Sequence, residues 1–356
     1  MDMKYDALAL FSGGLDSILA AKVVQDQGLR VLGLHYVTPF FGKPHKLDHW
    51  QRIYGLDLTS VDISAAFVRM LLNPAHGYGR LVNPCVDCKI LMLSHARELL
   101  ADYGARFLIS GEVVGQRPMS QRRDTLNLIR KQADVSDVLL RPLCAQKLDP
   151  TPMEESGLVD RSRLLDMGGR GRKAQLHLAR NVYALPEIPT PAGGCLLTEP
   201  ESAGRFYHIL KHDPAPDLTD FQLATLGRQF WAGAHWLSIG RHKDDNERIQ
   251  ELARPGDYLF DVDGFPSPLA LGRPLPGQDW NRETVLDAAA LMASYSPKAV
   301  RSGAPVGVAV RHGRGVDVVR VTPGRNTSLP WVEPDTVGLK EWKLECAEAR
   351  ADQTRG

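Results

Sequence analysis

The chain has 356 residues, 43% of them apolar, and its 43 Lys and Arg against 42 Asp and Glu give a formal net charge of +1. This length allows two domains with separate cores, and the composition is that of a globular protein. We find no apolar stretch that could cross a bilayer and no secretory signal. We therefore expect a cytoplasmic protein, without a membrane partner, whose five cysteines stay reduced. The neutral total does not decide about nucleic acid, because a local basic patch can exist within it.

The segment Ser12–Ser17, with the sequence SGGLDS, follows an apolar run at residues 7–11 and precedes a helical pattern. We expect the run to be a buried strand and the segment to lie at a helix N-terminus. Unpaired N–H groups and the helix dipole favour a phosphate there, and Gly13 and Gly14 let the main chain approach it. No Lys follows as it would in a Walker loop. The pattern predicts a nucleotide-binding loop, with an ordinary glycine-rich turn as the alternative.

Further strands are expected at residues 31–37, 58–63 and 106–110, with helical spacing between them. Strands that alternate with helices predict an α/β fold with a doubly wound parallel sheet. Ligands of such sheets bind at the carboxyl ends of the strands, so Gly13 and Gly111 would face one crevice.

A polar, proline-bearing segment at residues 211–217 has linker composition. We place the domain boundary between Glu199 and Asp220, with domains over residues 1–205 and 218–335. The second, smaller domain is expected to be α+β, with strands at 236–239, 258–260, 306–310 and 316–321 and a helix around 284–295. The charged stretch from Lys340 is expected to be frayed.

Three cysteines form a candidate site. Cys85 and Cys88 make a C-x-x-C pair, and Cys195 follows two glycines much later in the chain. Such a pair can bind metal, form a transient disulfide or shuttle sulfur. Structural zinc usually needs four protein ligands, which the sequence does not supply, whereas three thiolates suit an iron–sulfur cluster with one iron open to hydrosulfide. The alternative for Cys195 is a small buried residue. Cys144 is interpreted as a core residue, and neither it nor Cys346 is given a role.

Basic residues gather between Arg117 and Arg180, with thirteen Lys and Arg against eight Asp and Glu. Such a stretch could follow an RNA backbone, and a solvated charged face is the alternative. The candidate RNA contacts are Arg122, Arg123, Arg170, Arg172 and Lys173, with Arg241 in the second domain.

Four segments together resemble the tRNA-thiolating enzymes among the PP-loop ATP pyrophosphatases. They are SGGLDS, NPCVDCK at residues 83–89, ISGEVVGQRPMSQ at 109–121 and PTPAGGCLLT at 189–198. The third is similar to a stretch of the 4-thiouridine synthetase family, and the second also to bacterial 2-thiouridylases. The resemblance covers most of residues 1–200 and implies an adenine nucleotide α-hydrolase-like fold.

The resemblance also implies roles for individual residues. The ATP phosphates, with Mg²⁺, would be held by Ser12, Gly13, Gly14, Leu15, Asp16 and Ser17. The nucleotide and the target base would be bordered by His35, Gly111, Glu112, Gln116 and Ser120. Asp16 would help to place the metal, or it would simply cap the helix. Cys85, Cys88 and Cys195 would ligate a 4Fe–4S cluster, which we favour, or one would carry a persulfide and another resolve it.

The second domain resembles the RNA-associated NFACT-R fold. The similar segments are residues 238–241, 244–246, 255–260, 293–296 and 319–321. The usual 4-thiouridine synthetase carries an N-terminal THUMP domain for RNA, whereas this sequence starts directly at the first catalytic strand. Substrate recognition is therefore expected elsewhere, and the second domain is the candidate.

The resemblance implies ATP-dependent thiolation of a tRNA uridine, with 4-thiouridine as the favoured product. The uracil oxygen would be adenylated with release of pyrophosphate, and sulfur from sulfide or a cysteine desulfurase would then displace AMP. The alternatives are a tRNA 2-thiouridylase, a PP-loop amide ligase with a structural metal, and a non-catalytic RNA-binding quality-control protein. The sequence leaves the oligomeric state open, a homodimer included.

Overall fold

The structure is a computed structural model that describes residues 4–117, 120–190 and 194–353. The chain divides into two compact units, Met1–Leu196 and Leu197–Gly356. This division falls earlier in the chain than the expected boundary, because the helix α8 (Pro200–His212) belongs to the second unit. Among the described residues, no helix has the length and apolar character needed to span a bilayer.

The first unit is built on a five-stranded parallel sheet in the order β3-β2-β1-β4-β5. Its strands are β1 (Ala7–Leu10), β2 (Val31–Val37), β3 (Asp57–Asp62), β4 (Phe107–Ile109) and β5 (Leu139–Leu140). The chain winds outward from β1 in both directions, so the loops after β1 and β4 leave the sheet at a switch point, where open α/β sheets bind ligands. This confirms the predicted doubly wound α/β fold.

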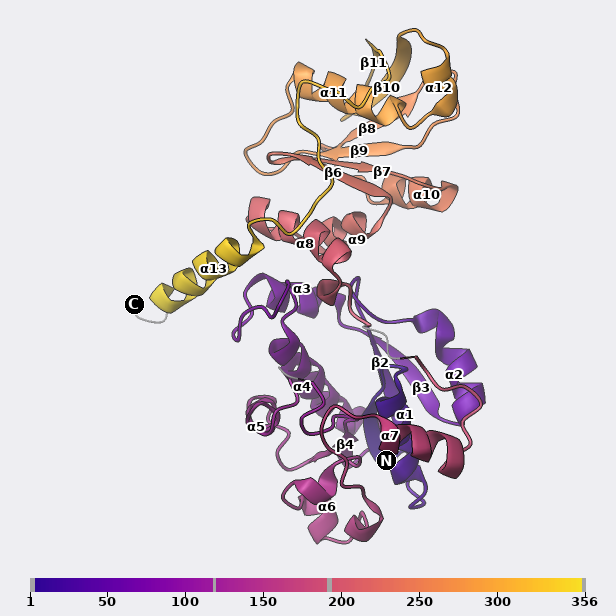
Figure 1. Ribbon diagram of the computed structural model, residues 1–356, viewed down its shortest axis with the longest axis vertical. Coiled ribbons are helices and arrows are strands. Elements are labelled where there is room, and N and C mark those ends of the chain that lie inside the picture. Colours follow the sequence, from indigo (N-terminus) through magenta and orange to yellow (C-terminus); the bar gives the residue numbers. More distant parts are fainter. Residues whose placement is uncertain (1–3, 118–119, 191–193, 354–356) are drawn as a thin grey trace. The chain divides into compact units, whose positions relative to one another are not determined.

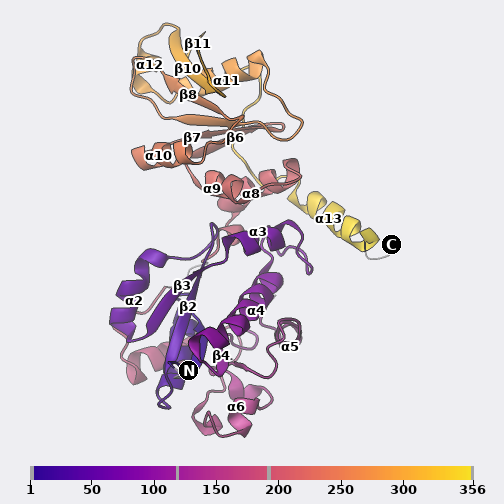
Figure 2. The same cartoon turned by 180° about the vertical axis from the view of Figure 1, so that it is seen from behind.

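Helices flank this sheet, as Figure 1 and the reverse view in Figure 2 show. They are α1 (Leu15–Gln25), α2 (Leu47–Tyr54), α3 (Ser64–Leu72), α4 (Cys85–Tyr103), α5 (Arg123–Gln132), α6 (Pro152–Glu155) and α7 (Lys173–His177), the last continued by a π-helical turn at Leu178–Val182. Short 3-10 turns lie at Pro44–Lys46, Ala145–Lys147, Arg161–Arg163 and Leu196–Thr198. β1 is buried along its whole length, which explains why it is an unbroken apolar run.

The second unit contains a six-stranded antiparallel sheet in the order β11-β10-β8-β9-β7-β6. Its strands are β6 (Arg228–Ala232), β7 (His235–Ile239), β8 (Tyr258–Val262), β9 (Ala270–Arg273), β10 (Val306–His312) and β11 (Gly315–Val321). Its other helices are α9 (Leu218–Thr225), α10 (Lys243–Glu251), α11 (Arg282–Ala293), α12 (Pro297–Arg301) and α13 (Leu339–Gln353). The apolar side of α11 and the inner face of the sheet form one core, which confirms the expected α+β class of this part.

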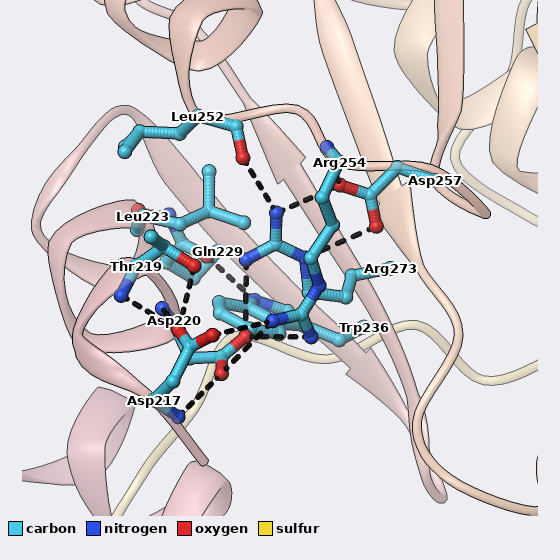
Figure 3. Close-up of polar contacts among 10 residues, drawn as sticks. All are labelled: Asp217, Thr219, Asp220, Leu223, Gln229, Trp236, Leu252, Arg254, Asp257 and Arg273. Carbon is cyan, nitrogen blue, oxygen red and sulfur yellow. Dashed lines mark hydrogen bonds and ion pairs between the residues drawn. The ribbon is translucent and has the colours of Figure 1, made fainter.

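A buried ion network ties α9 to the sheet of the second unit (Figure 3). The Arg273 side chain is fully buried and bonds to Asp257 at 2.7 Å and Asp220 at 3.0 Å. It also donates to the Leu252 carbonyl at 2.8 Å, and Arg254 reaches Asp220 from the partly exposed side at 3.1 Å. Because every charge in the network has a partner, the guanidinium can lie inside an otherwise apolar region.

Two expectations about the second unit differ from the structure. The charged stretch from Lys340, expected to be frayed, forms α13, whose Trp342 ring packs edge-on against Tyr207 at 5.6 Å. Lys211 and His212, read as linker, are the last residues of α8, and only residues 213–217 connect it to α9. In both places tertiary packing orders a polar segment that has little helical pattern of its own.

Candidate functional site

The SGGLDS loop links β1 to α1 and is shaped by its glycines. Gly13 has a φ of +75°, and a Cβ there would lie 2.5 Å from the Trp50 ring, so only glycine fits. The Ser17 hydroxyl donates to the Gly14 carbonyl at 2.8 Å and lies 3.3 Å from the Ser12 hydroxyl. Leu15 is buried in the core, so only its backbone is available to a ligand.

The end of β4 closes against the same loop through Gly111. A Cβ at Gly111 would lie 2.6 Å from the Asp16 carbonyl oxygen and 2.8 Å from the Ser17 nitrogen. The absence of a side chain therefore lets the residue after β4 touch the first turn of α1, so the segments carrying Gly13 and Gly111 meet at one edge of the sheet.

Asp16 points to the segment after β4 and not to the backbone of its own helix. Its Oδ2 accepts a 2.9 Å hydrogen bond from the Gln116 amide, and its Oδ1 is buried with no hydrogen-bond partner in the described part of the chain. Burial raises the pKa of Asp16, although Gln116, Arg172 and Arg117 act in the opposite direction. The sequence left two roles open for Asp16, placement of a metal or a simple helix cap. The structure does not show the helix cap.

Other unpartnered polar atoms surround this carboxylate. Gln116 Oε1, Arg172 Nε and Gln175 Nε2 are buried and, within the described residues, have no hydrogen-bond partner. All three residues lower the pKa of Asp16, Gln116 and Gln175 as side-chain hydrogen-bond donors and Arg172 by its charge, so they lie around it. A buried polar atom without a partner costs about 1–3 kcal/mol, so such a concentration indicates a site built for a polar ligand. A carboxylate oxygen beside amide and guanidinium donors fits a magnesium–phosphate group.

Two of the expected nucleotide contacts are engaged inside the protein. His35 Nε2 accepts from the Lys43 backbone N–H at 2.7 Å, so the proton is on Nδ1, which donates to the Phe11 carbonyl at 3.0 Å. Burial lowers the pKa of His35, which keeps the ring neutral. Its two hydrogen bonds hold the ring against the end of β1.

Glu112 is 2% exposed and bonds to the equally buried Arg141 at 3.0 Å. Burial by itself would raise the pKa of Glu112, but the Arg141 charge outweighs it and holds the pKa below its usual range. Cys144 donates to the Glu112 carbonyl from a fully buried position, in agreement with its reading as a core residue. Glu112 therefore stabilises the end of β4 through a buried ion pair.

The candidate thiols come from two distant segments. Cys85 and Cys88 lie in the first turn of α4, and the Asn83 amide donates to the Cys85 sulfur at 3.0 Å. Burial raises the pKa of the Cys88 thiol, and the charges of Cys195 and Cys85 raise it further. The three thiols are therefore close enough to influence one another. Pro191, Ala192 and Gly193, which precede Cys195 in the predicted turn, lie outside the described residues.

A single metal ion does not fit this arrangement directly. Among the residues that the structure describes, no three Cys, His, Asp or Glu side chains converge as ligands of one ion. An iron–sulfur cluster spreads its protein ligands over different irons, so it requires soft thiolates in one region and not their convergence on a point. The donor chemistry and the mutual influence of the three thiols fit that larger group.

The predicted basic contacts fall in different places. Arg122, Arg123 and Asp124 line an open groove of about 590 Å³ with Val114, Gly115 and Asn127 at the start of α5. Arg122 pairs with Asp124 there at 3.4 Å. Arg170 and Lys173 are exposed, while Ser120 is buried near the groove segment. Arg241 is exposed in the second unit, with its backbone N–H on Asp245 at 2.9 Å. Arg172 lies beside Asp16 instead. Pro118 and Met119, which precede Ser120, lie outside the described residues.

The site also contains residues that the sequence did not single out. Trp50, Arg141 and Gln175 carry no motif, and each acts through a contact with a residue distant in the chain. Only the position of Arg141, directly after an apolar run, gave a local signal that it lies at a strand end.

A glycine loop and a carboxylate at the switch point of an open α/β sheet are the arrangement at which such sheets bind ligands. Residues 3–149 match the family model of ThiI, described as thiamine biosynthesis protein. A "Probable tRNA sulfurtransferase" of Thermococcus kodakarensis is 26% identical over 142 residues, or 38% of this chain and 36% of that protein.

Two further relatives carry the same description. A "Probable tRNA sulfurtransferase" of Aeropyrum pernix is 32% identical over 170 residues, 44% of this chain and 38% of that protein. A "tRNA sulfurtransferase" of Marinobacter nauticus is 30% identical over 151 residues, 39% of this chain and 28% of that protein. The chain thus spans less than two fifths of the length of each of these relatives.

Proposed function

We propose that this protein is an ATP-dependent tRNA sulfurtransferase that replaces a uridine carbonyl oxygen with sulfur, with 4-thiouridine as the product. The observation that carries the proposal is the unpartnered Oδ1 of Asp16 at the SGGLDS loop, in the same unit as three mutually influencing thiols. The similarity to proteins described as tRNA sulfurtransferases supports the same reaction.

The first step is activation of the uracil oxygen. The loop N–H groups and the Ser12 hydroxyl would bind the ATP phosphates, and Asp16 would hold Mg²⁺, which neutralises phosphate charge. The uracil oxygen then attacks the α-phosphorus, and pyrophosphate leaves, so a poor leaving group becomes AMP. Gly111 matters here because it lets the end of β4 approach the first turn of α1, and Gly13 because it lets the loop pack against Trp50.

The second step is delivery of sulfur to the activated carbon. Burial raises the pKa of Cys88, so without a metal this thiol is a weak nucleophile at neutral pH. Metal binding displaces such a proton. Cys85, Cys88 and Cys195 would therefore hold a 4Fe–4S cluster, which supplies an open iron for sulfide. Persulfide transfer between the cysteines is the second candidate, with a cysteine desulfurase as the sulfur source.

The tRNA would be bound by the groove at the start of α5 in the first unit, through its two arginines, and by the second unit. Arg122 and Arg123 line the groove, and Arg170 and Lys173 are exposed in the same unit. Residues 218–335 would act as an NFACT-R-like RNA-binding domain that includes Arg241. The catalytic domain, expected over residues 1–205, would be the first unit, which ends at Leu196. We place the reaction in the cytoplasm, where the thiols stay reduced.

The test is an anaerobic reaction of the purified full chain with ATP, Mg²⁺, sulfide and unmodified tRNA. We expect 4-thiouridine in the digested tRNA and one AMP for each thiolated base. Cys195→Ala should abolish thiolation, whereas Cys346→Ala, on α13, should not. Pyrophosphate release without tRNA would support the amide ligase instead, and tRNA binding without AMP formation would support the quality-control protein. 2-Thiouridine in the digested tRNA would show that the protein is a 2-thiouridylase. Iron and sulfide analysis decides between the cluster and the persulfide.

A further inference from the structure

We infer that Arg172 and Gln175 form a second wall of the nucleotide phosphate site, with Arg172 as a phosphate ligand and not an RNA contact. This inference rests on the proposed function, since it assigns further residues to the same nucleotide site. Both residues lie beyond residues 3–149, which match the family model.

The two side chains present unused donors to the loop. Gln175 is 1% exposed, and its Nε2 has no hydrogen-bond partner among the described residues. Arg172 Nε is likewise buried without one in that part of the chain. Arg172 lowers the pKa of the Asp16 carboxyl by its charge, and the Gln175 side chain lowers it as a hydrogen-bond donor, at a distance longer than an ordinary hydrogen bond. The donors therefore lie beside the one unpaired carboxylate oxygen of the SGGLDS loop.

The packing of this segment holds the donors in place. Ala179 is fully buried in the core of the first unit, and Leu176 and Leu178 pack against that core. The segment also contacts α1, which begins with the loop. A rigid apolar anchor with two unpaired donors is costly unless a ligand supplies the acceptors, because each lost hydrogen bond is uncompensated.

Phosphate oxygens supply what these donors lack. A guanidinium binds phosphate through charge-assisted hydrogen bonds, and an amide N–H adds a neutral one. Asp16 Oδ1 needs the opposite kind of partner, a cation, and a magnesium–nucleotide brings both kinds at once. The charges of the site therefore complement those of the ligand: the carboxylate faces the metal cation, and the two donors face phosphate oxygens.

The test measures binding of α,β-methylene-ATP with Mg²⁺ to the full chain by calorimetry, and tRNA binding separately. Arg172→Gln should weaken binding of the analogue about 10-fold to 100-fold, as expected for a hydrogen bond to a charged group, and leave the tRNA Kd within about twofold. The matched control Arg170→Gln, exposed and two positions earlier, should leave binding of the analogue unchanged. Arg123→Gln, in the groove, should weaken tRNA binding only.

Gln175→Leu separates a ligand residue from a structural one. If the Gln175 amide binds the ligand, the melting temperature of the variant should be no lower than that of the wild type, and the variant should bind the analogue more weakly. Unchanged binding of the analogue in Arg172→Gln, or a loss of tRNA binding alone, would overturn the inference, as would a lower melting temperature with normal binding in Gln175→Leu. Binding of the analogue is measured without thiolation, so failure of the proposed function would be seen separately.

Discussion

The Gln116 amide donates a 2.9 Å hydrogen bond to the carboxylate of Asp16, one hundred positions earlier in the chain. This contact joins the segment after β4 to the first turn of α1. It leaves Asp16 Oδ1 as a buried acceptor that nothing in the described part of the protein satisfies. A buried carboxylate oxygen without a close partner is destabilising, so its contribution should be measurable as stability.

Asp16→Asn should stabilise the protein and abolish ATP turnover. Burial raises the pKa of Asp16, so its favourable contribution to folding exists at low pH and is lost as the pH rises through the raised value. At neutral pH the ionised carboxylate is a cost, and a gain of about 1 kcal/mol corresponds to a rise in Tm of about 2–4 °C. Calorimetry and pyrophosphate release measure the two effects. Asp102→Asn, at an exposed position of α4, should change neither, and a lower Tm in Asp16→Asn would contradict the account.

Gly111→Ala should destabilise the first unit and reduce ATP turnover together. The added Cβ would meet backbone atoms of Asp16 and Ser17 at 2.6 and 2.8 Å, and backbone cannot move aside as a flexible side chain can. We expect a loss of about 1–3 kcal/mol, typical of overpacking. Urea denaturation measures it. Gly171→Ala, with no atom near the new Cβ and no positive φ, is the matched control and should be neutral.

Glu112→Gln should cost about 3–5 kcal/mol, because it leaves the buried Arg141 charge without its partner. The pKa of Glu112 is held below its usual range, so its contribution is present above the unfolded-state value of about 4.3 and is lost as the pH falls through the folded-state value. The variant should therefore lose less stability in acid than the wild type does. Equal acid sensitivity of both proteins, measured by denaturation from pH 7 to pH 3, would count against this role. Glu98→Gln, exposed on α4, serves as the control.

Arg273→Met should destabilise the second unit and leave nucleotide binding by the first unit intact. The change removes the partner of two buried carboxylates, Asp220 and Asp257, and a cost of about 3–5 kcal/mol is expected. Arg254→Gln, at the partly exposed edge of the same network in Figure 3, should cost much less. Calorimetry should show a lowered transition in Arg273→Met with unchanged binding of α,β-methylene-ATP. Loss of nucleotide binding would show that the units do not fold independently.

Cys88 should react slowly with iodoacetamide near neutral pH in protein without iron, and faster as the pH rises. Burial raises its pKa, and the charge of Cys195 adds to the effect. Cys195→Ser should therefore speed alkylation of Cys88, whereas Cys346→Ser should not. Peptide mass spectrometry after timed alkylation gives the rates. No change in Cys195→Ser would show that the two thiols do not influence each other.

The sequence predicted those parts of the fold and site that have a local pattern. The buried parallel strand Ala7–Leu10 is an unbroken apolar run, and the position of Gly13 and Gly111 after two strands predicted that their segments lie at one edge of the sheet. β9 was missed, since it is a short strand that ends in a buried arginine. The partners of Arg273 lie 53 and 16 positions away, and those of Asp16 are equally remote. Contacts of this kind depend on tertiary packing and leave no periodic signal.

The most direct test of the central claim is mass spectrometry of tRNA nucleosides from cells that lack this gene and carry either the wild-type gene or Cys195→Ala. We predict that a thiolated uridine disappears without the gene, returns with the wild type and stays absent with Cys195→Ala. If every thiolated nucleoside persists at its normal level in the cells that lack the gene, the protein is not a tRNA sulfurtransferase.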